Sequence, residues 1–110
     1  MTAANNSSAE ATEMGIYESL KAVIDPELYV NIIDLGLVYG ISLKKEAFSV
    51  KVDLTLTSKG CPMGGAIIQD IEETLKRIYP GIDVLVQLVW EPSWSMEMVT
   101  EEGHAQLSGF

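Results

Sequence analysis

The run from Phe48 to Thr57 alternates between large apolar and smaller or polar side chains, and this period of two most constrains the fold. It is typical of a strand with one face buried and the other toward solvent. The run Leu37–Leu43 alternates in the same way. Because only the short polar link Lys44–Ala47 separates the two runs, the sequence predicts an antiparallel hairpin.

Two segments have the apolar spacing of amphipathic helices. The first starts after Thr12, a residue suited to an N-cap, and ends at Asp25-Pro26, because a residue before proline avoids the α region. The second follows the loop Ser58–Gly65 and stops at Pro80-Gly81. Its apolar stripe comprises Ile67, Ile68, Ile71, Leu75 and Ile78.

The run Ile82–Trp90 also alternates, but Leu85 and Val89 make it apolar on both faces, which predicts a central strand covered on two sides. The order helix, strand, strand, helix, strand predicts an α+β fold, a small two-layer sandwich with helices on one face of a three-stranded mixed sheet. A short C-terminal helix weakened by Gly103, or a tail, follows. We expect residues 1–12 to be a disordered tail and residues 13–110 a single domain.

The balance of charges and the single cysteine exclude several classes of protein. A formal net charge of -9 repels phosphate backbones and anionic lipid heads, so we expect no nucleic acid and no membrane as partner. The N-terminus lacks the features of a signal peptide, and no run approaches the ~18 apolar residues of a membrane span. One cysteine excludes an internal disulfide framework and a Cys-rich metal cage. These features predict a cytoplasmic protein.

The loop between the hairpin and the second helix carries that cysteine, Cys61, next to Pro62, which suits the first turn of a helix. At a helix start the unpaired N–H groups and the helix dipole stabilise a thiolate and lower a thiol pKa that is ~8.5 when free. A thiolate binds iron or attacks an electrophile. The position of Cys61 alone does not decide between these two roles. The structural alternative is a small buried hydrophobic residue.

Three segments resemble one known family. They are DPELYVNIIDLGLVYGI (residues 25–41), TLTSKGCP (residues 55–62) and VWEPSW (residues 89–94), and together they resemble the SufT/PaaD-like family of iron-sulfur assembly proteins. The resemblance runs from about Ile16 to Leu107. It implies an α+β fold, a role in the maturation of iron-sulfur proteins and a reactive cysteine before the second helix. Matching positions are Cys61 for that cysteine, Thr57 and Ser58 for the preceding hydroxyl pair, and Asp25, Glu27 and Asp34 for the acidic positions.

The sequence also departs from some relatives in this family. The resemblance includes no ATPase domain of the kind that some relatives carry, and the one histidine, His104, lies outside the three segments. We therefore expect any nucleotide-driven step to come from a partner.

The resemblance and the single thiol lead to one main hypothesis. One thiolate supplies one bond, whereas a stable cluster generally uses four protein ligands. We expect Cys61 to be the metal ligand for an iron-sulfur cluster held transiently, shared across a homodimer or with an assembly protein or apo client protein. The alternative is an adaptor that docks clients onto the assembly machinery without binding metal. A thiol enzyme is the weakest interpretation, since no histidine lies in the motif segments as a base.

The other candidate cofactor-binding residues each have a structural alternative. Asp25 and Glu27 either bind metal or position the cysteine loop, or they are turn residues. Asp34 either supports the site or caps the turn into the first strand. Thr57 and Ser58 hydrogen-bond either a sulfur or the loop backbone. Trp90 and Trp94 are expected to pack at the rim of the core.

Overall fold

The sheet contains three strands in the order β1-β2-β3 in the computed structural model, which describes residues 11–58 and 64–108. β1 (Val38–Lys44) pairs antiparallel with β2 (Ser49–Leu54), and β2 pairs in parallel with β3 (Asp83–Leu88). The hairpin and the mixed sheet predicted from the sequence are therefore confirmed. Residues 1–10, most of the predicted tail, lie outside the described residues. Ala11, at the end of that tail, is buried.

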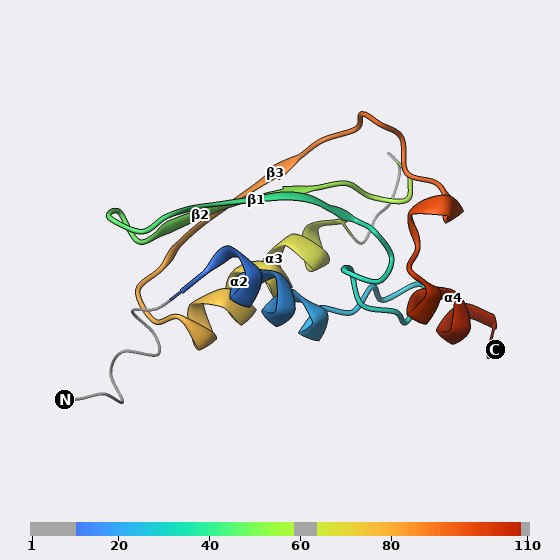
Figure 1. Cartoon of the computed structure of the whole chain (residues 1–110), viewed down its shortest axis with the longest axis horizontal. Coiled ribbons are helices and arrows are strands. Elements are labelled where there is room, and N and C mark those ends of the chain that lie inside the picture. The colour runs from blue at the N-terminus through green and yellow to red at the C-terminus, as the bar shows by residue number, and fades with distance from the viewer. Residues whose placement is uncertain (1–10, 59–63, 109–110) are drawn as a thin grey trace.

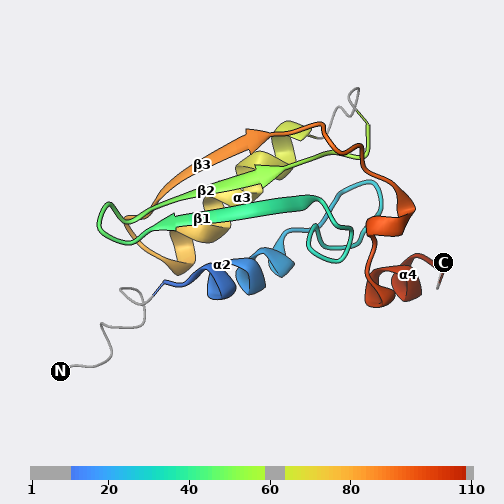
Figure 2. The same ribbon diagram turned by 45° about the horizontal axis from the view of Figure 1, so that its top comes forward.

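The helices form the second layer, on one face of the sheet, as predicted (Figures 1 and 2). α2 (Glu13–Ser19) continues as the short 3-10 helix η1 (Leu20–Ala22), and α3 (Gly64–Ile78) lies beneath the strands. After β3 come the 3-10 helix η2 (Met96–Met98) and α4 (Glu101–Ser108), beyond the end of the sheet where β2 and β3 finish (Figure 1). Among the described residues, no helix combines the length and the hydropathy needed to cross a membrane.

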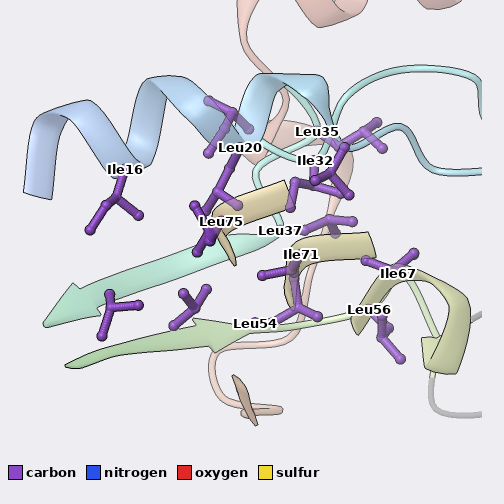
Figure 3. Packing of buried hydrophobic residues seen from close by; sticks show 14 of the residues in the cluster. Ile16, Leu20, Ile32, Leu35, Leu37, Leu54, Leu56, Ile67, Ile71 and Leu75 are labelled. Atoms are coloured by element: carbon purple, nitrogen blue, oxygen red, sulfur yellow. The ribbon is translucent and has the colours of Figure 1, made fainter. Parts of the chain in front are cut away.

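The core lies between the sheet and the helices (Figure 3). Val50, Val52 and Leu54 alternate into it from β2, as the period of two predicted. The helices contribute fully buried side chains, including Ile16, Leu20, Ile67, Ile71 and Leu75. Complete burial of such a side chain contributes about 1.5–3 kcal/mol. The stripe predicted for α3 is correct except at its end, because Ile78 is exposed.

The predicted place of the third strand is wrong. β3 is an edge strand and β2 is the central one. Leu85 points away from the helices and is 59% exposed, whereas its neighbours Val84 and Val86 pack partly against the core. A strand that is apolar on both faces is usually covered on both, but here the outer face of β3 is open.

The N-cap predicted at Thr12 is confirmed, since its Oγ1 accepts a hydrogen bond of 2.9 Å from the Gly15 N–H. Replacing Thr12 with alanine leaves this N–H without its acceptor. We expect a loss of about 0.5–2 kcal/mol in the free energy of unfolding, measured by denaturant titration. Thr12→Ser keeps the hydroxyl and should stay within about 0.5 kcal/mol of the parent protein. Equal losses in both variants would contradict a capping role.

Candidate functional site

The segments that follow β2 and β3 leave the same end of the sheet side by side, because the two strands are parallel (Figure 2). The Val89 N–H donates to the Leu54 carbonyl at 2.9 Å and so extends the pairing past the end of β3. Between the two segments lies a cavity of about 170 Å³. Its walls are Thr55–Ser58 on one side and Trp90, Glu91, Ser93 and Trp94 on the other.

Two of the three segments that carry the family resemblance line this cavity, and the first segment is hydrogen-bonded to both of them. The Thr55 N–H donates to the Leu37 carbonyl at 2.8 Å, which joins the second segment to the first. The Trp94 Nε1–H donates to the Leu35 carbonyl at 2.7 Å, which joins the third segment to the first. Hydrogen bonds thus hold together three segments that are distant in the sequence.

The walls of the cavity combine hydroxyl groups, one carboxylate and two indole rings. Thr57 is half-buried and Ser58 is exposed, and both residues of the predicted hydroxyl pair line the cavity. Hydroxyls donate hydrogen bonds to anionic atoms, and the carboxylate of Glu91 accepts them. Trp90 and Trp94 are half-buried and pack against the core, which confirms their predicted place at its rim.

Besides the two tryptophans, four cavity residues were not predicted as site residues: Thr55, Leu56, Glu91 and Ser93. The first two belong to the TLTSKGCP segment and the others to VWEPSW, so membership in a motif was the signal that pointed to them. Glu91 also lines a larger hollow of about 600 Å³ with Asp53, Tyr39 and Met98 among its other walls. Asp53 Oδ1 is buried there without a hydrogen-bond partner among the described residues. Lys51 Nζ lies 3.8 Å from it, an ion-pair distance too long for a hydrogen bond.

Asp25 and Glu27 do not line the cavity. Asp25 is buried, and its Oδ1 accepts hydrogen bonds from the N–H groups of Glu27 (2.7 Å) and Leu28 (3.0 Å). This carboxylate therefore orders the turn that follows the proline, as aspartate often does in turns. Glu27 is exposed. Their role as ligands stays a prediction.

Asp34 is buried and joins the loop before β1 to the C-terminal helix. Its Oδ2 accepts from Asn31 Nδ2 at 2.8 Å, and its Oδ1 accepts from the Thr100 hydroxyl at 2.9 Å. Thr100 Oγ1 in turn accepts from the Gly103 N–H at 3.0 Å in the first turn of α4. Gly103 packs closely there, since a Cβ at this position would lie 2.7 Å from the Asp34 carbonyl oxygen.

Cys61, the predicted metal ligand, lies outside the described residues. On either side of it the structure describes Ser58, which lines the cavity, and Gly64, where α3 begins. Among the described residues, no group of three or more His, Cys, Asp and Glu side chains is placed to hold a metal ion. His104 is exposed.

The fold and the cavity define a small α+β protein that gathers three motif segments at one end of a mixed sheet. The profile of the family described as "Iron-sulfur cluster assembly protein" matches residues 13–87. The chain belongs to this family. The resemblance seen in the sequence is thereby confirmed.

Individual relatives agree with this assignment. The chain is 45% identical over 78 residues to the Fe-S protein maturation auxiliary factor SufT of Staphylococcus aureus, covering 71% of this chain and 88% of that protein. It is 33% identical over 73 residues to an iron-sulfur cluster carrier protein of Deinococcus radiodurans, covering 66% of this chain but 20% of that longer protein. A crystal structure of a domain of unknown function from Bacillus anthracis matches with a TM-score of 0.83 and 39% identity, covering 87% of this chain and 91% of that one.

Proposed function

We propose that this protein is an auxiliary factor in the maturation of iron-sulfur proteins, and that Cys61 holds an iron-sulfur cluster as transient cargo. The observation that carries the proposal is the family match over residues 13–87, which includes the cysteine-bearing segment. The similarity to an auxiliary maturation factor over most of both chains supports the general role. The similarity of 73 residues of this chain to one fifth of a cluster carrier supports the role in transfer.

A single thiolate suits transfer better than storage. A stable cluster generally uses four protein ligands, so Cys61 leaves most iron positions for other donors. In this proposal the other ligands come from an assembly protein as the cluster arrives and from an apo client protein as it leaves. The cluster is therefore cargo, and the protein performs no reaction of its own as an enzyme.

The cavity beside the cysteine segment supplies groups suited to such cargo. Thr57 and Ser58 lie four and three residues before Cys61 in the sequence and face the cavity. In this proposal their hydroxyls donate hydrogen bonds to sulfur atoms of the cluster, and such bonds tune the properties of iron-sulfur centres. Asp25, Glu27 and Asp34 act in this proposal by ordering the loops around the site, which agrees with the hydrogen bonds that Asp25 and Asp34 make.

Anaerobic reconstitution with iron and sulfide tests the proposal directly. We expect visible sulfur-to-iron charge-transfer bands in the parent protein and their loss in Cys61→Ala, because alanine offers no ligand. Ser42→Ala, a change of similar size at an exposed position of β1, is the matched control and should keep the bands.

Three outcomes separate the carrier from the adaptor. Loss of the bands in Cys61→Ala alone supports a carrier. A parent protein without bands, combined with normal client maturation in cells that contain only Cys61→Ala, supports an adaptor that does not touch iron. Full bands in Cys61→Ala would show that the cluster is held by other residues and would remove Cys61 from the proposal.

A further inference from the structure

The two edges of the sheet are covered differently. At the β1 edge, α2 lies alongside the strand, and Glu13 Oε2 accepts a hydrogen bond of 3.1 Å from the Leu43 N–H. At the other edge, β3 has β2 as its one strand neighbour among the described residues. Figure 2 shows β3 on the side of the sheet away from α2. The β3 edge is therefore the one that a further strand can reach.

The direction of the hydrogen bonds shows which backbone groups of β3 face outward. The N–H groups of Asp83 and Val89 donate toward β2, to the carbonyls of Phe48 and Leu54. N–H groups alternate in direction along a strand. The backbone groups of the even-numbered residues between Asp83 and Val89 therefore point away from β2. The outward row thus consists of the N–H and C=O groups of Val84, Val86 and Leu88.

After Asp83, the side chains along this edge are uncharged, and all of them except Gln87 are apolar. Leu85 is 59% exposed and Leu88 is 39% exposed, and no residue from Val84 to Val89 carries an ionisable group. Soluble proteins usually protect edge strands with lysine, proline or a bulge. β3 has none of these, and its register with β2 is regular over its whole length. The edge has the properties of a pairing surface.

The outward row is self-complementary in an antiparallel register, so β3 of a second copy of this chain offers a matching strand. We propose that two copies of this chain pair antiparallel through β3 about a twofold axis at Val86, forming one continuous sheet. In this register Val86 faces its own counterpart and Val84 faces Leu88 of the second copy, so each outward N–H meets a carbonyl. Leu85 lies opposite Gln87, and Asp83 lies opposite Val89, so no like charges face each other across the pair.

This dimer covers part of Leu88, which the single chain leaves 39% exposed. Leu88 comes to lie beside Val84 of the second copy, on the face of the sheet that α3 covers. The net charge of -9 opposes association of two copies, but the repulsion acts between charges outside the paired strands. Salt screens such charges, with a Debye length of about 8–10 Å at 0.1–0.15 M. Dimerisation should therefore strengthen as salt is added. Binding of a basic partner would instead weaken, because salt screens the attraction between opposite charges.

The arrangement also keeps the two cavities apart. Trp90 lies four residues beyond the twofold axis in sequence, which is about 13 Å along an extended chain, and the two strands run in opposite directions. The cavities of the two copies therefore lie at opposite ends of the joint sheet, about 26 Å apart along the strands. Each cavity in this dimer is separate from the cavity of the second copy, so a cluster is not shared between the two copies through this interface. The proposal for the dimer does not depend on the proposed function.

Sedimentation velocity of the full chain, from about 1 µM to about 1 mM, tests the pairing. We expect a dimer that forms with rising concentration and more readily at higher salt. Leu88→Lys places an ammonium group against Val84 of the second copy and should raise Kd more than about tenfold, because an unpaired charge is costly to bury. The matched control is Met14→Lys, the introduction of the same side chain at an exposed apolar position on α2, and it should dimerise like the parent protein.

A second variant tests the backbone pairing itself. Val86→Pro removes an N–H that faces outward and leaves the bonds to β2, and proline is tolerated at such edge positions. Circular dichroism checks that each variant is folded. We expect Val86→Pro to be monomeric at concentrations where the parent protein is a dimer. A parent protein that stays monomeric over the whole range, or variants at Leu88 and Val86 that dimerise like the parent, would overturn the proposal.

Discussion

Gly36→Ala is expected to lower the free energy of unfolding by at least about 3 kcal/mol and the melting temperature by more than about 10 °C. Gly36 has a φ of +78°, in the left-handed region, where an L residue with a Cβ costs about 1–2 kcal/mol. A Cβ there would also clash with the Met98 carbonyl oxygen and would lie 2.9 Å from the Met98 carbonyl carbon. Both atoms belong to the backbone, so the clash is not relieved by a rotation of a side chain.

The segment containing Met98 has little freedom to move away. The Met98 N–H donates to the Ser95 carbonyl at 3.0 Å, and Met98 Sδ lies 3.1 Å from the Tyr39 hydroxyl. Two residues later the Thr100 N–H donates to the Asp34 carbonyl at 2.9 Å. A shift of Met98 therefore strains contacts on both sides of the loop before β1.

Gly65→Ala is the matched control for this prediction. Gly65 is an exposed residue of α3, and a Cβ added there would meet no neighbouring atom within 4 Å. Alanine is a better helix former than glycine, so stability should be unchanged or rise by up to about 1 kcal/mol. Thermal unfolding followed by circular dichroism compares the two variants. If Gly36→Ala melts within about 2 °C of the parent, the Met98 backbone moves aside without a large loss of stability, and the prediction is wrong.

Local patterns in the sequence were sufficient to predict the layers of the fold. The period of two in Val50, Val52 and Leu54 predicted the buried face of β2, and the helical spacing of Ile67, Ile71 and Leu75 predicted the buried face of α3. These patterns are informative because a strand and a helix bury residues at different intervals. The N-cap at Thr12 was readable for the same reason, since it depends on an interaction across three residues.

The position of β3 was not readable from its own residues. Leu85 and Leu88 are apolar whether a strand is central or forms an interface at the edge of the sheet. The order of strands depends on which chain segments pair, and the identity of these two residues does not determine it. In the structure β3 is at the edge of the sheet, and both side chains are partly exposed.

The candidate site depends on contacts between residues far apart in the chain. Trp94 and Leu35 are separated by 59 residues, and Thr100 and Asp34 by 66. A single sequence carries no periodic signal for such pairs. The three motif segments could be identified by resemblance, but the hydrogen bonds that join them, and the cavity that two of them line, required the three-dimensional structure.

Asp34→Ala is the second change for which we expect a large effect, a loss of about 2–4 kcal/mol in the free energy of unfolding. The carboxylate is buried and accepts from Asn31 Nδ2 and from the Thr100 hydroxyl. Alanine removes both acceptors and leaves the amide and the hydroxyl to find others. Since Thr100 also accepts from the Gly103 N–H, the start of α4 loses part of its support.

The location of the effect distinguishes this role from general destabilisation. Hydrogen exchange should speed up most in α4 and in the turn around Asn31, while the amides of β2 keep most of their protection. Glu97→Ala removes one carboxylate from an exposed position in η2 and serves as the control, with a change within about 0.5 kcal/mol. Thr100→Ser keeps the hydroxyl and should retain most of the stability. If Asp34→Ala leaves exchange in α4 unchanged, the carboxylate does not anchor this helix, and the backbone bond from the Thr100 N–H to the Asp34 carbonyl is sufficient to hold it.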